Sequence, residues 1–337
     1  MNLIQRQQHL LPQIESGLQF FLDSFDFNHS LPLKHMIRYQ MGWEDQGSKG
    51  KRIRPFLVLL IASALGGEVE VSMPAALSVE FLHNFTLIHD DIEDQSPLRH
   101  NRPTLWKRWG VAQAINAGDA LFSIAQLSML DLQSTCSSSI ALKAAGLLNQ
   151  TCLHLTRGQY LDMSFETEDN VTPQIYLEMI AGKTGALLGL CAVLGGLTAA
   201  QDDEKIRILD DFGTALGMAF QIRDDILGIW GNPEKTGKSV SSDLQTKKKT
   251  LPILVGLVES QPFQNLWQMD DVDETQIKQM AGLLEECGAR KFAQQKAEEY
   301  TKQAFDALEI LFPSPADKNP HAETLFELCT ELLKREI

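Results

Sequence analysis

Long stretches of the sequence carry apolar residues at the three- and four-residue spacing of helices. Proline, which breaks helices, is absent from residues 104–172 and again from 174–232, and both stretches are rich in Ala, Leu, Met and Gln. Between them, Thr172 and Pro173 have the residue types of a helix cap and a first helical turn. Convincing period-two alternation, the mark of strands, is not found. The sequence therefore predicts an all-α protein.

Glycine, proline or clustered polar residues interrupt this helical pattern in short stretches. The expected loops are 26–32, 44–50, 95–104, 165–172, 230–250, 260–274 and 312–321. There is no internal repeat, low-complexity tract or obvious linker. We therefore expect residues 1–337 to form a single all-α domain.

Composition narrows the class of protein. The formal net charge of -14 argues against a nucleic-acid partner, since such a protein needs a basic surface. The five cysteines lie far apart without a CxxC pair, which disfavours structural zinc and disulfides and indicates a reducing compartment. The N-terminus lacks a signal-peptide core, and every apolar stretch is too short to span a membrane. We expect a cytoplasmic protein with no integral membrane segment.

An acidic cluster, "HDDIED" at residues 89–94, follows directly after an apolar helical run. Residues four apart share one helical face, so Asp90 aligns with Asp94 while Asp91 points about 100° aside. His83 and Thr86 lie below Asp90 on the same face. Crowded carboxylates repel one another, and Mg²⁺ relieves this while taking further ligands from water and phosphates. Taken alone, the cluster is equally compatible with a solvated acidic helix end.

A second acidic pair strengthens the metal hypothesis. Asp224 and Asp225, in "FQIRDDILGIWG", again lie near the end of an apolar helical run. The position four residues after Asp224 is Gly228, so this cluster offers fewer oxygen ligands. Two such helix ends facing each other would hold a diphosphate between metal ions.

Basic residues accompany both acidic clusters. They comprise Lys49, Lys51, Arg52 and Arg54 in "KGKRIRP", Arg99 and Arg102 after the first cluster, and five lysines within residues 231–250. Each of these charges, taken alone, is explained as a solvated residue on the protein surface. Together they fit a site for phosphates and Mg²⁺, which requires both signs of charge.

Two other motifs are weaker. "GNPEKTGKS" has five residues between Gly231 and Gly237 where a nucleotide-binding P-loop has four, and no strand precedes it. His89 and Asp90 have the order of a metal-dependent phosphohydrolase of the HD type, but the chain lacks a clear set of spaced His and Asp partners for them.

Taken together, these motifs closely resemble those of the trans-polyprenyl diphosphate synthases, of the short-chain geranylgeranyl and farnesyl diphosphate type. The resemblance runs from about Gly50 to Pro252. "GKRIRP", "HNFTLIHDDIEDQSPLR", "GQYLD", "GKTGALL", "FQIRDDILG", "TGKS" and "DLQTKKKTLP" occur in the order typical of that family. Each motif alone is weak, but the ordered set is specific.

The resemblance implies roles for individual residues. The catalytic residues are Asp90, Asp91, Asp94, Asp224, Asp225 and Lys183, of which Asp90, Asp94 and Asp224 would bind Mg²⁺. The allylic diphosphate would be held by Arg99, Lys183, Thr184, Gln221, Lys238 and Lys248. Isopentenyl diphosphate would be held by Lys51, Arg54 and His83. Gln159 and Asp162, one turn apart, would line the same cavity.

The implied fold is a bundle of long helices around a deep central cavity, usually a homodimer. The implied reaction is ionisation of an allylic diphosphate, addition of the cation to isopentenyl diphosphate and loss of a proton. Family members with a bulky aromatic residue five positions before the first aspartate make short products, and Phe85 holds this position. The small Thr86 beneath Asp90 favours geranylgeranyl diphosphate, with farnesyl diphosphate next.

The sequence departs from the family pattern at two places. Many relatives have paired arginines after the first motif, whereas Arg99 is followed by His100 and Asn101, so that Arg102 is left as a possible substitute. Gly228 replaces the last aspartate of the second motif, which related short-chain synthases tolerate.

Two alternative functions stay open. A class I terpene synthase would share the metals and the allylic diphosphate, but would not need Lys51, Arg54 and His83. An impaired subunit of a heteromeric synthase, or a prenyl-diphosphate-binding scaffold, would not turn over alone. The complete set of Asp90, Asp91 and Asp94 disfavours impairment.

Overall fold

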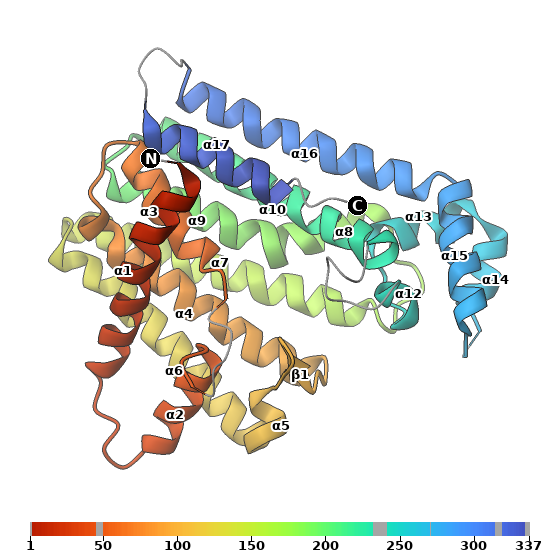
Figure 1. Cartoon of the computed structure of the whole chain (residues 1–337), viewed down its shortest axis with the longest axis horizontal. Coiled ribbons are helices and arrows are strands. Elements are labelled where there is room, and N and C mark those ends of the chain that lie inside the picture. Colours follow the sequence, from red (N-terminus) through yellow and green to blue (C-terminus); the bar gives the residue numbers. More distant parts are fainter. Residues whose placement is uncertain (1, 45–49, 232–240, 270, 314–318, 334–337) are drawn as a thin grey trace. The chain divides into compact units, whose positions relative to one another are not determined.

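The computed structural model describes residues 2–44, 50–231, 241–269, 271–313 and 319–333 (Figure 1). Within these ranges, regular structure is almost entirely helical. The strands found there are β1 (Leu98–Arg99) and β2 (Arg102–Pro103), which pair antiparallel. The prediction of an all-α protein is confirmed.

Internal contacts divide the chain into two compact units. The first comprises Met1–Thr151, Leu190–Leu209 and Pro315–Leu325, and the second Cys152–Gly189, Asp210–Ser314 and Phe326–Ile337. Four helices contribute residues to both: α7 (Ser138–Ser164), α9 (Ala186–Thr198), α10 (Asp203–Trp230) and α17 (Pro320–Leu333). The single domain over 1–337 stays a prediction.

The first unit contains most of the N-terminal helices. They are α1 (Leu3–Asp23), α2 (Leu31–Gln40), α3 (Ile53–Ala64), α4 (Val69–Glu93), α5 (Leu105–Trp109), α6 (Val111–Leu130) and the short 3₁₀ helix η1 (Asp131–Ser134). Asn2 and Gln5 form a reciprocal capping box that satisfies two free amides at the start of α1. α3 is apolar on all sides, and residues 56–62 are fully buried because the helix lies inside the core of the unit.

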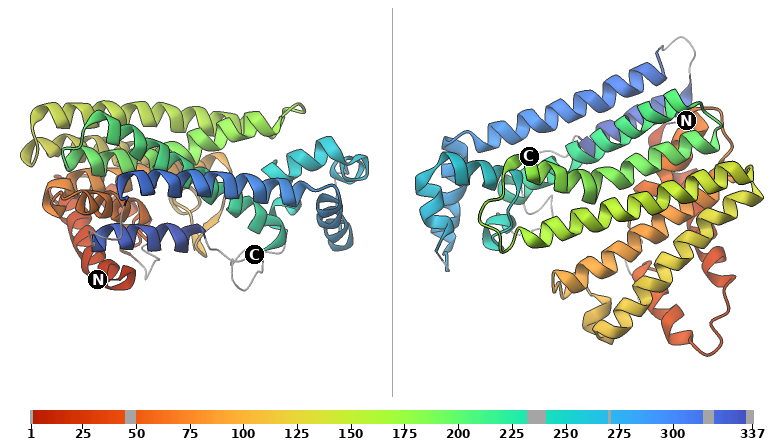
Figure 2. Two further views of the ribbon diagram at one scale, coloured as in Figure 1. Left: turned by 90° about the horizontal axis from the view of Figure 1, so that it is seen from above. Right: turned by 180° about the vertical axis from the view of Figure 1, so that it is seen from behind.

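Helices α4 and α6 pack side by side in antiparallel directions (Figure 2). The hydroxyl of Ser78 donates to the carbonyl of Ala125 at 2.7 Å, and that of Ser128 donates to the carbonyl of Pro74 at 2.9 Å. These bonds satisfy buried hydroxyls and hold the two backbones together. The pairing fixes the end of α4, where the first acidic cluster lies.

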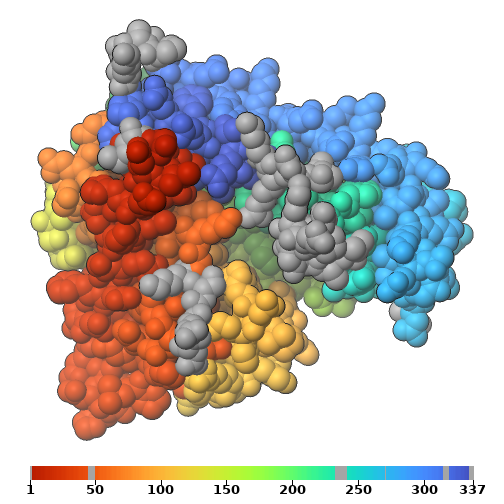
Figure 3. Space-filling model, in the orientation of Figure 1, coloured from red at the N-terminus to blue at the C-terminus, as the bar shows by residue number. Residues whose placement is uncertain are grey.

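A hairpin follows α4 and reaches the molecular surface together with α5, as the gold atoms of Figure 3 show. Its two turn residues, His100 and Asn101, have φ angles of 50° and 61°. Two successive left-handed residues make the turn that matches the twist of a tight hairpin, and Asn is favoured there. The turn returns the chain so that Arg99 pairs with Arg102 across the hairpin.

The second unit contains the remaining helices. They are α8 (Pro173–Ile180), the π-helix η2 (Ala181–Gly185), α12 (Ser242–Gln245), α13 (Leu251–Glu259), α14 (Gln261–Trp267), α15 (Glu274–Glu286) and α16 (Ala289–Leu311). As predicted, Thr172 caps α8: its hydroxyl accepts from the amide of Ile175 at 3.2 Å. The core includes Tyr176 and Ile180 of α8, packed with Ile222 and Ile226 of α10.

The expected loop over 260–274 is wrong in its first half. Ser260 caps the amide of Phe263 at 3.3 Å, and Pro262 fits the first helical turn, so α14 forms there.

One helical stretch in the described chain, Pro173–Thr198, is long and apolar enough to cross a membrane, but 72% of its most apolar window is buried inside the structure. This burial is typical of a core helix.

Candidate active site

The first acidic cluster lies at the C-terminal end of α4, and its three aspartates differ in exposure. The side chain of Asp91 points inward and the residue is only 2% exposed, whereas Asp90 is half-buried and Asp94 is exposed. This is the arrangement that helical periodicity predicts, since Asp90 and Asp94 share a face and Asp91 does not. The accessible pair is therefore Asp90 and Asp94.

Arg99 holds the buried Asp91 in place. Its Nε donates to both carboxylate oxygens, at 2.9 and 3.1 Å, and its Nη2 lies 2.8 Å from Oδ1. Burial raises the pKa of Asp91, and the hydrogen bonds and charge of Arg99 oppose that rise. Arg99 was predicted to bind the allylic diphosphate; in the structure it also fixes the acidic end of α4.

Arg54 and His83, both predicted to bind isopentenyl diphosphate, are brought together. Nη1 of Arg54 lies 3.0 Å from Nε2 of His83. Burial, with the charges of Arg54, Arg99 and Arg52, keeps the pKa of His83 well below its usual value. Because an arginine only donates, the neutral imidazole accepts through Nε2. Nε of Arg54 is buried and finds no acceptor among the described residues.

Arg52, in the same basic segment, has a structural role. Its Nε donates to Glu15, its Nη1 to Glu80 and its Nη2 to the carbonyl of Met41, each at 2.7 Å. The side chain is buried, and these carboxylates compensate its charge. The neighbouring Lys51 is exposed. Arg52 is thus less accessible than Lys51 and Arg54, the two residues of this segment that were predicted to bind isopentenyl diphosphate.

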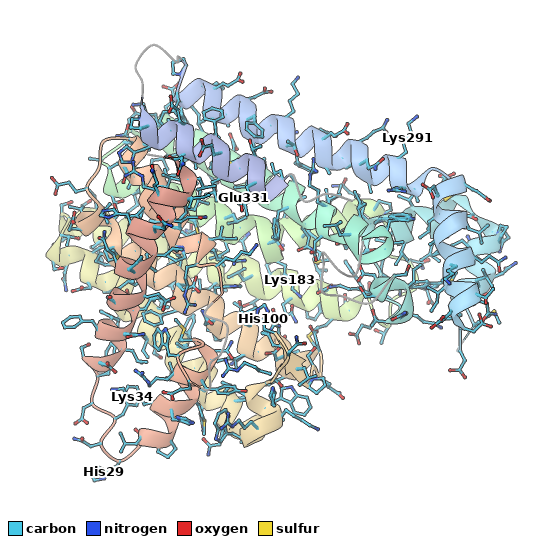
Figure 4. The ribbon with its side chains drawn as sticks, viewed as in Figure 1. His29, Lys34, His100, Lys183, Lys291 and Glu331 are labelled. Atoms are coloured by element: carbon cyan, nitrogen blue, oxygen red, sulfur yellow. The ribbon has the colours of Figure 1, made fainter. Side chains whose placement is uncertain are left out.

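Arg102 is held at the end of α2. Its guanidinium lies over the ring of Tyr39, 3.9 Å from the centroid. Its terminal nitrogens donate to the carbonyls of Tyr39 and Glu44 at 3.4 and 3.2 Å. This arrangement lends no support to the idea that Arg102 replaces the missing second arginine. His100, labelled in Figure 4, is exposed at the turn.

Phe85 lies between α4 and α6. Its ring centroid is 4.7 Å from that of His89 and 5.2 Å from that of Phe122 on α6. Thr86 donates its hydroxyl to the carbonyl of His83, one turn back, at 2.8 Å. The two positions assigned to product length therefore differ in setting: Phe85 is locked by neighbouring rings, and Thr86 turns its hydroxyl back to its own helix.

In the second unit, Lys183 and Thr184 lie in the π-helix η2, a wider turn of a kind often found at functional sites. Nζ of Lys183 (Figure 4) pairs with Oδ2 of Asp162 on α7 at 2.5 Å. α7 and η2 approach so closely that a Cβ added at Gly158 would lie 2.4 Å from the backbone nitrogen of Lys183. Only glycine fits there, and the close approach brings Asp162 within reach of Lys183.

Three predicted residues of the second unit form one hydrogen-bonded chain. The hydroxyl of Thr184 donates to Oε1 of Gln221 at 3.0 Å, and Nε2 of Gln221 donates to Oδ1 of Asp225 at 3.1 Å. The phenol of Tyr176 donates to the other oxygen of Asp225 at 2.5 Å. Burial raises the pKa of Asp225 to about 7, against the effect of these donors. Asp225 therefore orients Gln221.

Tyr176 was missed from the sequence. It is 1% exposed and would be read as a core residue. The sequence held no clear signal for it, because a lone tyrosine in an apolar helix also fits a core position. A buried tyrosine needs a partner for its hydroxyl, and Asp225 provides one.

The lysines after the second acidic motif divide into structural and exposed ones. Lys249 donates to the carbonyls of Phe165 and Glu168 at 2.6 and 2.7 Å, and Lys247 donates to the carbonyl of Met269. Lys248 between them is exposed, as a diphosphate ligand requires. The predicted ligand Lys238 lies outside the described residues.

Comparison with known proteins identifies the family. The family model for polyprenyl synthetase matches residues 35–286. The chain belongs to the polyprenyl synthetase family. It is 39% identical over 295 residues to a geranylgeranyl diphosphate synthase of Mycobacterium tuberculosis, covering 84% of this chain and 83% of the relative.

Further relatives support the family assignment. The chain is 36% identical over 288 residues to a (2E,6E)-farnesyl diphosphate synthase of Mycobacterium bovis, covering 81% of this chain and 79% of that relative. A crystal structure of geranylgeranyl pyrophosphate synthetase from Pyrococcus horikoshii matches with a TM-score of 0.87 and 30% identity, covering 99% and 98% of the two chains. The resemblance found in the motifs is thereby confirmed.

For a polyprenyl synthetase, the carboxylates fit the hypothesis of Mg²⁺. Among the described residues, no three His, Cys, Asp or Glu side chains converge on a ready-made metal site. Instead, α4 presents the pair Asp90 and Asp94, and α10 presents Asp224, which is half-buried, beside the inward Asp225. Mg²⁺ is commonly held by one or two carboxylates together with water and substrate phosphates. The donor set suits a metal that arrives with a diphosphate.

Proposed function

We propose that the protein is a magnesium-dependent, short-chain trans-prenyl diphosphate synthase that joins isopentenyl diphosphate to an allylic diphosphate. The observation that carries this proposal is Arg54, whose buried Nε lacks an acceptor among the described residues beside the neutral His83. A buried guanidinium with an unused donor is suited to a diphosphate oxygen. A terpene synthase, which uses only the allylic substrate, has no need of this second anion site.

Different residues are proposed to bind the allylic diphosphate and isopentenyl diphosphate. Asp90 and Asp94 in the first unit, and Asp224 in the second, would each hold Mg²⁺, which would supply positive charge to stabilise the leaving pyrophosphate. Lys183, held by Asp162, and Arg99 add cationic donors for the allylic diphosphate.

Lys51 and Arg54 hold isopentenyl diphosphate while its double bond attacks the allylic carbon. The C–O bond to pyrophosphate breaks first, and the double bond then adds to the resulting allylic cation to form the new C–C bond. One proton then leaves the product carbon skeleton, and the released pyrophosphate accepts it.

The product proposed is geranylgeranyl diphosphate, with farnesyl diphosphate as the second candidate. Thr86 is small and turns its hydroxyl to its own helix, and we propose that the growing chain passes this side chain beneath Asp90. Phe85 is fixed by His89 and Phe122, so it forms a rigid boundary on the neighbouring side. Thr86→Phe is expected to shorten the main product by one isoprene unit, which mass spectrometry of the extracted products measures.

A second copy of this chain is the proposed partner. Leu142, Leu153 and Tyr160 lie on one face of α7 and are 68%, 67% and 70% exposed. Their spacing of 11 and 7 residues repeats three and two helical turns, so they form an apolar stripe suited to a helix of another copy.

The oligomeric state of the protein tests whether this apolar stripe forms an interface with a second copy. Leu153→Glu is expected to convert a dimer to a monomer in sedimentation, whereas Phe20→Glu, at a 78% exposed position on α1, should not. A wild-type monomer would overturn the proposal.

The proposed compartment is the cytoplasm. All five cysteines are free, and Cys191 and Cys329 are fully buried, as expected for a protein that does not use disulfides.

The activity is tested with purified protein, Mg²⁺, labelled isopentenyl diphosphate and one allylic starter of five, ten or fifteen carbons at a time. We expect incorporation of label into longer prenyl diphosphates, with Arg54→Met lowering incorporation far more than release of pyrophosphate from the allylic substrate alone. Pyrophosphate release without incorporation would favour a terpene synthase. No reaction by the purified chain would favour a partner-dependent subunit.

A further inference from the structure

Lys51, one of the two cations proposed to hold isopentenyl diphosphate, lies between two residues with left-handed backbone conformation. Gly50 has a φ angle of 69° and Arg52 a φ angle of 46°. Glycine adopts this region freely because it has no Cβ. An arginine adopts it only at a cost, since its Cβ crowds the following carbonyl oxygen. The backbone at Arg52 therefore needs contacts that hold it in this conformation.

Arg52 is also the residue from which α3 begins. It is the N-cap of that helix, with φ and ψ angles of 46° and 38°, and Arg54 is the second helical residue. The backbone angles at position 52 therefore set how the segment that carries Lys51 is oriented relative to Arg54. A change of these angles would turn Lys51 away from Arg54, although neither cation is itself altered.

Carboxylates from two different helices hold the guanidinium of Arg52. Its Nε donates to Oε1 of Glu15 on α1, and its Nη1 donates to Oε1 of Glu80 on α4, both at 2.7 Å. Arg52 and Glu80 are buried, and the side chain of Glu15 is 17% exposed. Because an uncompensated buried charge is costly, Arg52 cannot readily turn away from these partners.

Each carboxylate is itself fixed by a further donor. The other oxygen of Glu15, Oε2, accepts from Nε1 of Trp43 at 2.7 Å. Oε1 of Glu80 also accepts from Nδ2 of Asn84, one turn along α4, at 3.1 Å. The two carboxylates are therefore held where they meet Arg52, and this guanidinium joins α1 and α4 to the start of α3.

Glu80 also acts on the neighbouring Arg54. Burial lowers the pKa of Arg54, and the charge of Glu80 opposes that effect. Glu80 precedes His83 by three residues on α4, so the two share a helical face, and Arg54 lies 3.0 Å from His83. The carboxylate that holds Arg52 therefore also helps to keep Arg54 cationic, as a diphosphate ligand must be.

We propose that Glu15 and Glu80 are positioning residues for the binding of isopentenyl diphosphate. They fix Arg52 in its left-handed conformation, and Arg52 in turn sets the orientation of Lys51 and Arg54. This role rests on the proposed function. Neither carboxylate touches the substrate, since both act through Arg52. Loss of either weakens the binding of isopentenyl diphosphate and spares that of the allylic diphosphate, which depends on other residues.

Glu15→Gln tests this role with little change in size, because an amide has one acceptor oxygen and cannot hold both Arg52 and Trp43. The KM for isopentenyl diphosphate should rise about tenfold, the equivalent of one weakened charged hydrogen bond. The KM for the allylic diphosphate and kcat should change by less than about twofold. Glu70→Gln, at an exposed carboxylate in the first turn of α4, is the matched control and should change neither KM.

A second pair of variants tests the backbone conformation itself. Arg52→Gly and Arg52→Ala lose the same guanidinium and leave the same carboxylates unpaired, but only glycine adopts the left-handed region freely. Arg52→Ala should therefore raise the KM for isopentenyl diphosphate at least about fivefold more than Arg52→Gly does. Adding Glu15→Gln to Arg52→Gly should raise it no further, since Glu15 acts through Arg52.

Urea unfolding of each variant monitors folding. Glu15→Gln retains the ion pair of Arg52 with Glu80, so it keeps the test independent of the Arg52 variants if these fail to fold. A purely structural role would lower stability, leave the KM for isopentenyl diphosphate unchanged in Glu15→Gln, and give equal KM values for Arg52→Gly and Arg52→Ala. Either of these KM results would overturn the proposal.

Calorimetric titration with isopentenyl diphosphate in EDTA separates the positioning role from the proposed function. Binding by the wild type without turnover would reject the proposed function, and a loss of affinity in Glu15→Gln, or its absence, would still decide the positioning role. An active wild type whose affinity and KM for isopentenyl diphosphate are unchanged in Glu15→Gln would reject the positioning role alone.

Discussion

The two acidic motifs share a design but compensate their inner carboxylates differently. In each, one aspartate of a consecutive pair points inward and is 2% exposed: Asp91 in α4 and Asp225 in α10. Asp91 is held by the guanidinium of Arg99, whereas Asp225 is held by a phenol and an amide, from Tyr176 and Gln221. A neutral partner stabilises a buried charge less than a cation does.

The outer carboxylates differ as well. α4 provides two outward carboxylates, Asp90 and Asp94, whereas α10 provides Asp224 and has Gly228 four residues later. Helical spacing thus fixes which aspartates face outward in both motifs. The partner of the inner carboxylate is local in the first motif, where Arg99 follows Asp91 by eight residues, and remote in the second, where Tyr176 precedes Asp225 by 49 residues.

The largest expected effect concerns the outward aspartates. Asp90→Ala should reduce product formation about 10³-fold, because it removes a metal ligand that offsets charge on the leaving group. Glu93→Ala, at an exposed carboxylate on the same helical turn, should change it little. Both are measured as kcat with isopentenyl diphosphate and an allylic starter. A loss below about tenfold in Asp90→Ala would contradict the assigned role.

The next effect concerns stability at Asp91. Arg99→Met should lower the free energy of unfolding by about 2–3 kcal/mol, because it leaves a buried carboxylate without its charged donor. The Arg99 side chain is 33% exposed, which keeps the effect below that of a fully buried pair. Urea unfolding measures this loss.

Two further variants control that measurement. Asp91→Asn combined with Arg99→Met should recover part of the loss, since a neutral amide costs less to bury than a carboxylate. Lys107→Met, at an exposed site on α5, should be neutral. An equal loss in the single and double variants would show that Arg99 stabilises the fold by contacts other than Asp91.

The hydrogen bond from the neutral Tyr176 to Asp225 should contribute less to stability than the bond from Arg99 to Asp91. Tyr176→Phe removes one hydrogen bond to Asp225 and should cost about 1 kcal/mol in urea unfolding. Its second readout is the KM for the allylic diphosphate, which should rise more than kcat falls, because Gln221 loses its orientation. Tyr160→Phe, on the exposed face of α7, is the matched control. If Tyr176→Phe cost more than Arg99→Met, the proposed difference between the motifs would be wrong.

The smallest effect is a pH dependence at His83. Its pKa is well below the usual value, because burial and the cations Arg54, Arg99 and Arg52 disfavour the imidazolium. The unfolded chain therefore binds a proton near pH 6.5 that the folded chain does not, and stability falls as pH decreases through that region.

This loss should be about 0.7 kcal/mol between pH 7 and pH 6. His83→Gln should flatten the dependence, whereas His29→Gln, in the exposed loop between α1 and α2 (Figure 4), should not. An unchanged slope in His83→Gln would mean that the imidazole is protonated in the folded state.

The sequence was sufficient for the helical fold and for the outward aspartates because both follow from periodicity. It was insufficient where burial decides a role. Arg52 and Arg54 are two residues apart, yet Arg52 is neutralised by Glu15 and Glu80, which come from α1 and α4. The role of Tyr176 likewise depends on its contact with Asp225 of α10, which is 49 residues away in the sequence.

Removing the metal shows whether the aspartates at the ends of α4 and α10 bind the ion that the reaction requires. The protein is treated with EDTA and assayed for incorporation of isopentenyl diphosphate, and Mg²⁺ is then restored stepwise to the wild type, Asp90→Asn and Asp224→Asn. We predict no product without metal, full recovery of the wild type, and little recovery of either variant at the same Mg²⁺ concentration. Product formed in EDTA, or recovery of both variants alongside the wild type, would contradict the claim that these two helix ends bind the metal required for prenyl transfer.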